Sequence, residues 1–184
     1  MATNTLVEAD IWTVAQTDQG NVVLVRPKKS ELAVPIFIGQ LETQSILIGL
    51  GRVEVPRPLT HDLFLSALKA LGADLTRIEI NDLREGTFYA RLILVRGEET
   101  LVVDARPSDA IAAAVRAGCP VFIAEAIVEE AGISVNLVSE SSKLEASGAE
   151  DEKERLRKEL EEAIAEEDYE RAARIRDKLK ELEG

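Results

Sequence analysis

The sequence contains one cysteine and one histidine, and aromatic residues make up 4% of its 184 positions. A single cysteine excludes a disulfide framework within the chain, which is typical of a reducing compartment, and we expect a cytoplasmic location. The acidic, alternating start "MATNTLVEADIWTVAQ" has no basic segment followed by an apolar core, so we expect no signal peptide. No apolar run approaches the roughly 20 residues of a transmembrane helix, so we expect no membrane partner.

Positive charge is also scarce. The chain has 22 Lys and Arg residues against 34 Asp and Glu residues, which gives a net charge of -12. Such an acidic protein is not a bulk binder of polyanions, because phosphate contacts require clustered Lys and Arg. The charge favours basic partners and leaves open a local nucleic-acid site, particularly one that binds a metal. Because aromatic residues are few, the core must consist of Val, Leu, Ile and Ala.

The composition divides the chain into three parts. Up to about residue 138, short apolar runs alternate with turns, which indicates one folded domain over 1–138. Residues 139–150 are small, polar and acidic, as in a flexible linker. Residues 151–184 consist almost entirely of helix-forming residues.

The order of elements in the first part predicts an α+β fold, with a mixed, largely antiparallel sheet covered by two or three helices. "VEADI" and "VVLVR" flank a turn and predict a hairpin, and "ELAVPIFIG" predicts a third strand. A helix is expected over 40–50, between two glycines, and another after Thr60 as its N-cap. Three antiparallel strands, the helix after Pro107, a short strand at "PVFIA" and a short helix at "EAIVEEAG" follow.

The tail predicts an antiparallel helical hairpin. One apolar stripe contains Leu156, Leu160 and Ile164, and the other contains Tyr169, Ala172, Ile175, Leu179 and Leu182. Each stripe is too narrow for a stable domain, so we expect the helices to pair with each other and then with a protein partner. A solvated, highly charged helical tail is the alternative.

A first cluster of chemically active side chains lies where a strand meets a helix, in "DARPSDA". It contains Asp104, Arg106, Ser108 and Asp109. Asp104 and Arg106 are two residues apart, so they would share one face of a strand. Ser108 and Asp109 are suited to cap the helix, and Pro107 is suited to its first turn. Capping explains most of these residue types, and a catalytic role is the alternative.

Other candidates lie in two further helices. His61 follows Thr60 in "RPLTHDLF", where it is suited to act as a general base or a metal ligand, and Asp62 is beside it. A helix N-terminus would lower the pKa of His61, although an ordinary, partly exposed histidine explains the sequence equally well. Glu42 lies in an apolar helix and needs a cationic partner, either Arg57 or Arg106.

Three long segments in the first part resemble the bifunctional nuclease domain family. They are "PIFIGQLETQSILIGL", "RPLTHDLFLSALKALGADLTRIEINDLREGTFYARLIL" and "DARPSDAIAAAVRAGCPVF", and the similarity covers roughly residues 6–133. The tail, "LRKELEEAIAEEDYERAARIRDKLKELE", resembles the UVR motif of UvrB and UvrC, a helical hairpin that mediates protein–protein association. Members of the nuclease family often carry such a tail.

The resemblance implies an enzyme that cleaves phosphodiester bonds of DNA and RNA, with a protein partner bound through the tail. Among the positions that match the family, we expect His61, Asp62, Arg106 and Asp109 to be the catalytic residues, on the basis of their residue types. Substrate binding would fall to Arg57 and Ser108, and a divalent cation, magnesium or manganese, would bind to Glu42 and Asp104.

Two alternatives to a nuclease stay open. The acidic composition, the lone histidine and the absence of a dense metal-ligand motif favour a non-catalytic adaptor, whose α+β domain binds a ligand or partner while the tail recruits another protein. A homo-oligomer formed through an exposed strand edge is the other. The sequence leaves unanswered whether Glu42, His61 and Asp109 lie close together.

Overall fold

The computed structural model describes residues 5–135, 156, 159–160 and 174–178. The chain divides into two units, residues 1–135 and 136–184. The predicted linker over 139–150 lies outside the described residues, so the predicted domain limits stay a prediction. Among the described helices, none is long and apolar enough to cross a membrane.

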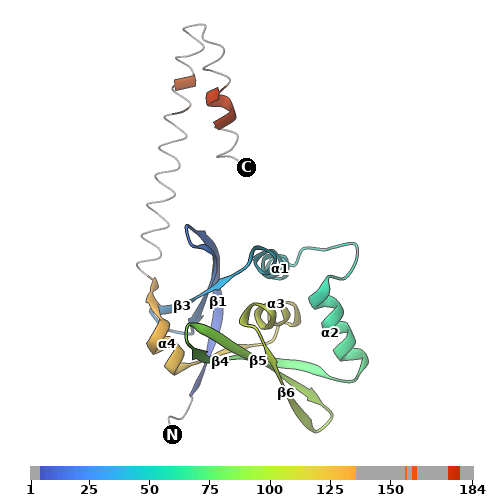
Figure 1. Ribbon diagram of the computed structural model, residues 1–184. Helices are drawn as coiled ribbons and strands as arrows, with labels where there is room; N and C mark the ends of the chain where they lie inside the picture. Colours follow the sequence, from blue (N-terminus) through green and yellow to red (C-terminus); the bar gives the residue numbers. More distant parts are fainter. Residues whose placement is uncertain (1–4, 136–155, 157–158, 161–173, 179–184) are drawn as a thin grey trace. The chain divides into compact units, whose positions relative to one another are not determined.

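The described part of the first unit contains eight strands and four helices (Figure 1). The strands are β1 (Leu6–Thr17), β2 (Gly20–Pro27), β3 (Leu32–Ile38), β4 (Asp74–Arg84), β5 (Thr87–Arg96), β6 (Glu99–Ala105), β7 (Val121–Ala124) and β8 (Ile133–Ser134). The helices are α1 (Gln40–Leu50), α2 (Thr60–Ala70), α3 (Pro107–Ala117) and α4 (Glu125–Ala131). The predicted order of elements is confirmed.

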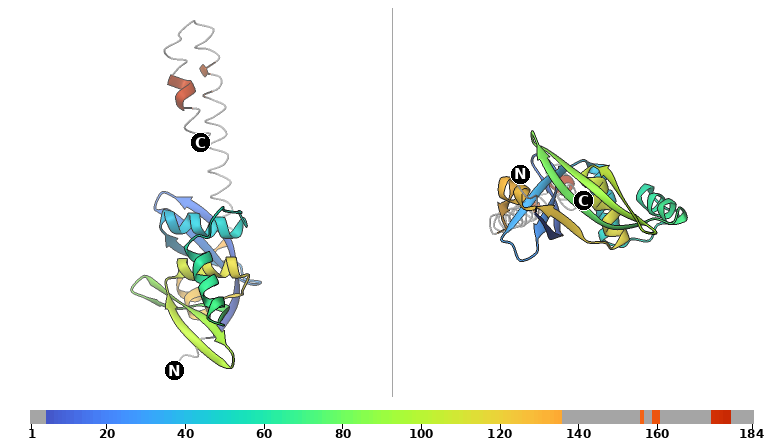
Figure 2. Two further views of the ribbon diagram at one scale, coloured as in Figure 1. Left: turned by 90° about the vertical axis from the view of Figure 1, so that its right-hand side faces the viewer. Right: turned by 90° about the horizontal axis from the view of Figure 1, so that it is seen from below.

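All eight strands form one sheet in the order β6-β5-β4-β7-β1-β2-β3-β8. Neighbouring strands are antiparallel except β4 and β7, so the predicted mixed, largely antiparallel sheet is confirmed. Helix α3 packs on β4 and β5, and it also contacts α1 and α2. Figures 1 and 2 show these three helices lying together, whereas α4 lies apart from them and packs against β3, β4 and β7.

Helix α3 is the central helix of the unit. Pro107 occupies its first turn as predicted, since a residue without an N–H leaves no donor unpaired there. Gly118 ends the helix with a φ of 67°, in the left-handed region that glycine adopts without strain. Most of its other residues are small and buried; they are Ser108, Ala110, Ile111, Ala112, Ala113 and Ala114.

The predicted capping of α3 is wrong. The N-cap is Arg106, which therefore does not share a strand face with Asp104, because β6 ends at Ala105. No side chain caps the helix with a hydrogen bond. Ser108 is buried, and Asp109 binds Arg106 instead of the backbone. Asp109 pairs with the guanidinium of Arg106, three residues earlier, because a hydrogen bond between two charged groups is stronger than one from a neutral backbone N–H.

The predicted cap of α2 is wrong as well. Thr60 is the first residue of the helix, and Leu59 is its N-cap. The side chain of Asp62 accepts a hydrogen bond from the backbone N–H of Leu59, at 2.9 Å. A carboxylate in the first turn satisfies this donor and interacts favourably with the positive end of the helix dipole, so Thr60 is not needed as a cap.

Gly49 allows α1 to lie directly against α3. A β-carbon at this position would be 2.5 Å from Cγ2 of Val115 and 3.0 Å from Nη1 of Arg116. Gly49 itself is buried. Any larger residue would therefore push α1 away from α3.

A buried carboxylate lies in the middle of the sheet. Glu79 on β4 is 1% exposed, and its two oxygens bind Nε of Arg77 and Nε of Arg91. Burial opposes the ionisation of Glu79, but the hydrogen bonds from both arginines outweigh it and hold its pKa below the ordinary value. Both arginines are partly exposed, so these ion pairs extend from the buried carboxylate to the solvent.

Within the second unit, only a few residues are described. Leu156 and Ile175 are buried, and Leu160 packs against them. Leu156 and Leu160 belong to one predicted apolar stripe, and Ile175 belongs to the other. Ile164, Tyr169, Ala172, Leu179 and Leu182 lie outside the described residues, so the complete hairpin stays a prediction.

We expect Gly49→Val to lower the free energy of unfolding by about 1–3 kcal/mol, because overpacking forces α1 and α3 apart. Urea denaturation of the full chain measures this. Gln44→Val, at an exposed position of the same helix, is the matched control and should change stability by less than about 0.5 kcal/mol. Equal stability of the two variants would mean that the close approach of α1 and α3 is not a constraint.

Candidate functional site

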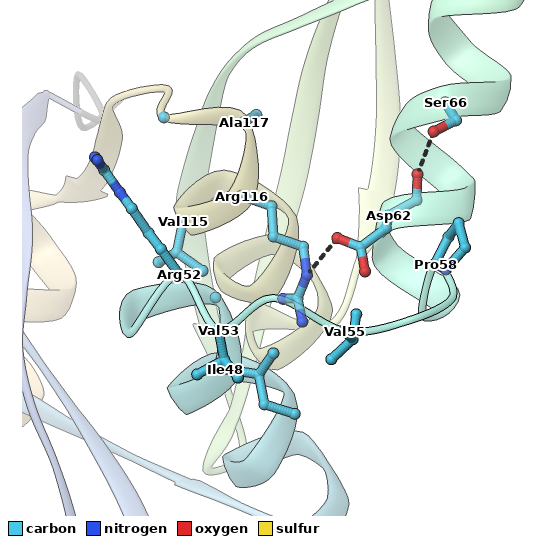
Figure 3. Close-up of a pocket in the computed structure, with 12 residues that line it drawn as sticks. Ile48, Arg52, Val53, Val55, Pro58, Asp62, Ser66, Val115, Arg116 and Ala117 are labelled. Atoms are coloured by element: carbon cyan, nitrogen blue, oxygen red, sulfur yellow. Dashed lines mark hydrogen bonds and ion pairs between the residues drawn. The ribbon is translucent and has the colours of Figure 1, made fainter.

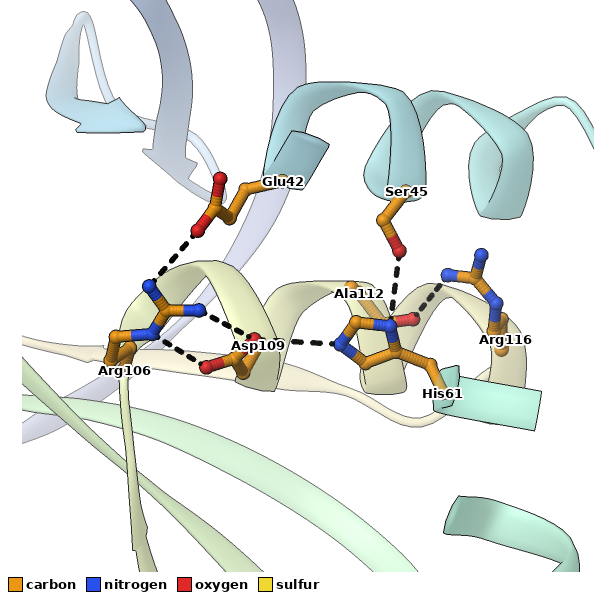
Figure 4. Close-up of polar contacts among 7 residues, drawn as sticks. All are labelled: Glu42, Ser45, His61, Arg106, Asp109, Ala112 and Arg116. Carbon is orange, nitrogen blue, oxygen red and sulfur yellow. Dashed lines mark hydrogen bonds and ion pairs between the residues drawn. The ribbon is translucent and has the colours of Figure 1, made fainter. Parts of the chain in front are cut away.

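Four polar side chains from three helices meet beside the start of α3 (Figure 4). Glu42 comes from α1, His61 from α2, and Arg106 and Asp109 from α3 and its N-cap. Arg106 donates from Nη1 to Oε1 of Glu42 at 2.9 Å, across 64 residues of sequence. Nε2 of His61 lies 3.6 Å from Oδ1 of Asp109. The structure thus brings together Glu42, His61 and Asp109, the three groups whose proximity the sequence left open.

Arg106 is held by two carboxylates. Its Nε donates to Oδ2 of Asp109 at 2.8 Å and its Nη2 to Oδ1 at 3.1 Å, a bidentate pair. Hydrogen bonding and charge from Asp109, followed by those from Glu42, raise the pKa of Arg106 above its ordinary value. The side chain is nevertheless 65% exposed, so the guanidinium remains accessible to another anion.

His61 is fixed from both sides of its ring. Nδ1 lies 3.0 Å from Oγ of Ser45 on α1, while Nε2 faces Asp109. The imidazole is only 18% exposed. Burial is the main cause that lowers the pKa of His61, and the positive charge of Arg116 lowers it further, although Asp109 opposes both. His61 is therefore neutral at pH 7, as a general base has to be.

Asp62 joins α2 to α3. Its Oδ1 accepts from Nε of Arg116 at 3.0 Å, and its Oδ2 accepts from the backbone of Leu59. Arg116 also donates from Nη1 to the carbonyl oxygen of Ala112, at 2.9 Å. Both oxygens of Asp62 are thus bonded within the fold. This geometry suits the positioning of His61 on the adjacent residue better than a direct part in chemistry.

Three of the predicted site residues are not joined to the cluster. Arg57 is exposed in the segment between α1 and α2, and Asp104 is exposed on β6. Within the described part of the chain, no hydrogen bond or ion pair connects either of them to Glu42, His61 or Asp109. Ser108 is 6% exposed and lines a neighbouring hollow together with Glu42 and Arg106.

The cluster forms one wall of a cavity of about 630 Å³. The other walls are apolar or neutral and come from α1 and from the segment that leads into α2. Leu41, Gln44, Ser45, Ile48, Pro58, Leu59 and Thr60 line them. A base, a cation and two carboxylates thus face a space that is large enough for a nucleotide unit.

The donor atoms of the cluster suit a hard divalent cation in type. Mg²⁺ prefers oxygen ligands and usually takes one or two carboxylates, with water and substrate phosphate as the others. Glu42 and Asp109 supply two such carboxylates, which share Arg106 as their present counter-charge. Across the described residues, no group of three His, Cys, Asp or Glu side chains forms a complete ligand set. Asp109, and not Asp104, is the carboxylate beside Glu42.

Sequence reasoning missed two members of this arrangement, Ser45 and Arg116. Their spacing from predicted site residues in the sequence indicates that they belong to the same site. Ser45 is three residues after Glu42 on α1, and Arg116 is seven residues after Asp109 on α3, so each shares a helix face with a predicted site residue. Cys119, by contrast, lies outside the cluster: it packs against the core, and burial raises the pKa of its thiol to about 11.

Comparison with known protein families gives two matches. The model of the bifunctional nuclease domain matches residues 22–136, and that of the UvrB/UvrC motif matches residues 150–184. Both agree with the resemblance that the sequence motifs indicated.

Individual proteins are also similar to this chain in sequence. An uncharacterized protein of Mycobacterium tuberculosis is 41% identical over 158 residues, which are 85% of this chain and 92% of that protein. Bifunctional nuclease 1 of Oryza sativa subsp. japonica is 27% identical over 117 residues, 62% of this chain and 35% of the rice protein. Bifunctional nuclease 1 of Arabidopsis thaliana is 24% identical over 177 residues, 86% of this chain and 54% of that protein.

The single histidine makes the electrostatics of the cluster directly measurable. We expect an NMR titration of the His61 ring protons to give a pKa below 6.5, because burial and Arg116 disfavour the imidazolium. Asp109→Asn should lower this pKa further, since the carboxylate that stabilises the charged ring is neutralised. Arg116→Gln should raise it. A shift in the same direction in both variants would contradict the arrangement described here.

Proposed function

The chain belongs to the bifunctional nuclease domain family, and on this premise we propose that its first unit hydrolyses phosphodiester bonds of DNA and RNA at the cluster of Glu42, His61, Arg106 and Asp109. The observation that carries the proposal is the convergence of a neutral histidine, an accessible guanidinium and two carboxylates on one cavity. These are the groups that hydrolysis of a phosphodiester requires: a base, a counter-charge for phosphate and ligands for a cation.

His61 acts as the general base. When Nδ1 carries the proton and donates to Oγ of Ser45, the lone pair of Nε2 is free beside Asp109, at the wall of the cavity that both residues line. Nε2 then accepts a proton from the attacking water. Asp109, whose Oδ1 lies 3.6 Å from this same Nε2, stabilises the imidazolium that forms through its negative charge. The protonated ring can afterwards return the proton to the leaving oxygen.

Arg106 binds the phosphate. Its guanidinium presents several N–H donors in a planar fork, which matches the oxygens of a phosphodiester. In the structure these donors are occupied by Glu42 and Asp109, so the substrate competes with two carboxylates. A divalent cation, Mg²⁺ or Mn²⁺, bound by these carboxylates would supply charge neutralisation and activation of water. Arg106 would then be free to bind the substrate.

The tail contributes a protein-binding module in this proposal. The UvrB/UvrC motif match covers residues 150–184 and begins after the nuclease domain match has ended. The tail residues Leu156, Leu160 and Ile175 already pack against one another. We propose that it recruits a partner and takes no part in cleavage.

A second candidate function is that of a non-catalytic adaptor, and one observation favours it. With His61 neutral, Glu42, Asp109 and Arg106 sum to a net charge of -1, which repels a phosphodiester unless a cation binds. The same helices expose large apolar side chains: Leu41, which lines the cavity, is 78% exposed, and Leu63, elsewhere on α2, is 63% exposed. Exposed apolar patches of this kind often mark protein-binding surfaces.

Cleavage assays separate the two functions. The purified full chain is incubated with end-labelled single- and double-stranded DNA and RNA, in Mg²⁺, in Mn²⁺ and in chelator. We expect His61→Ala to lower the rate by about 10²–10⁴-fold, since it removes the base. Asp109→Asn should lower it as well. Lys69→Ala, at an exposed position of α2 outside the cavity, is the matched control and should cleave like the unaltered protein.

The variants are compared only after circular dichroism shows that each is folded. The rate should also fall as the pH drops through a pKa below 6.5, because protonated His61 cannot accept a proton. Cleavage that persists unchanged in both site variants contradicts the proposed site. An absence of cleavage under every condition would favour the adaptor.

A further inference from the structure

A second cavity lies on the other side of the segment that joins α1 to α2. Its volume is about 660 Å³, and residues of α1, α2, α3 and that segment line it (Figure 3). Glu42, His61, Arg106 and Asp109 do not line it. It shares only Ile48 and Pro58 with the cavity of the proposed active site.

Arg116 gives this cavity a buried cationic group. The side chain is 7% exposed, and its Nε and Nη1 donate to Asp62 and to the carbonyl oxygen of Ala112. Nη2 is fully buried and has no hydrogen-bond partner among the described residues. Buried polar groups are nearly always hydrogen-bonded, and an unpaired charged donor is particularly unfavourable. The fold therefore leaves one strong donor, Nη2, without a partner among the described residues.

The charge balance around the cavity favours an anion. Asp62 neutralises Arg116, but Arg52 also lines the cavity, so the three groups together carry a net charge of +1. Figure 3 shows the guanidinium of Arg116 between Asp62 and the segment that carries Val53 and Val55. This segment is exposed throughout residues 51–59, and a ligand would have to displace its two valines outward to reach Nη2.

The remaining walls are mostly apolar. Ile48, Val53, Val55, Pro58 and Val115 line them, with the hydroxyl-bearing Ser66 at one side. Cavities of roughly 300–1,000 Å³ with apolar walls and a few polar groups typically bind small organic molecules. The lining thus suits a ligand that has a charged end and an apolar or aromatic body, in contrast to a bare inorganic anion.

We propose that this cavity binds a phosphate monoester with an aromatic body, such as a mononucleotide, and that Nη2 of Arg116 donates to its phosphate. This site goes beyond the proposed function, because it uses none of the proposed catalytic groups and requires no cleavage.

Calorimetric titration of the full chain with adenosine 5′-monophosphate tests the proposal. Two control ligands are titrated in the same way: adenosine, which has the aromatic body without the charge, and inorganic phosphate, which has the charge without the body. We expect the monophosphate to bind at least about tenfold more tightly than either, since both parts contribute. Binding no tighter than that of adenosine overturns the proposal.

Variants locate the binding. Arg116→Met should weaken binding of the monophosphate by about tenfold or more, because it removes the buried donor. Arg52→Glu, at an exposed position that lines the cavity, should weaken binding by roughly threefold or more through charge. Lys69→Glu makes the same change of charge outside the cavity and should leave the affinity unaltered. If Arg116→Met does not fold, Arg52→Glu decides: an affinity equal to that of Lys69→Glu overturns the proposal.

Discussion

The close packing of α3 against the sheet and against two further helices is the constraint on which the first unit depends. Its alanines bring the α3 backbone near its neighbours, and Gly49 lets α1 approach until a single β-carbon would collide with Val115. Interiors are packed as densely as organic crystals, so such contacts fix helix positions to within a fraction of an ångström. Residues that lie far apart in the sequence, such as Glu42 and Arg106, thereby become neighbours.

This packing produces two sites with different electrostatics from one set of helices. Arg106 lies at the exposed start of α3, between two carboxylates, whereas Arg116 lies buried near its end with one. His61 is between them and responds to both ends, because Arg116 lowers its pKa and Asp109 raises it. The protonation of the single histidine should therefore respond to the charges of Asp109 and Arg116, near the two ends of α3.

Much of the fold was predictable because its signals are local. The glycines on either side of α1, the turns between strands and Pro107 at the start of α3 all specify backbone conformation within a few residues. The caps of α2 and α3 were not predictable, since Asp62 and Asp109 also find arginine partners. The site was predictable in part: His61, Glu42, Arg106 and Asp109 converge, whereas Arg57 and Asp104 do not join them. Long-range pairs such as Arg116 with Asp62, 54 residues apart, depend on helix packing that sequence alone does not give.

The central claim is that His61 acts as a base in a site preformed by α3. Chemical rescue tests it most directly: His61→Ala leaves a space of imidazole size between Ser45 and Asp109. We expect added imidazole to restore cleavage by this variant in a saturable manner, and to have no effect on the unaltered protein or on Asp109→Asn. Cleavage by the unaltered protein without any rescue of the variant, at imidazole concentrations that leave it folded, would contradict the claim.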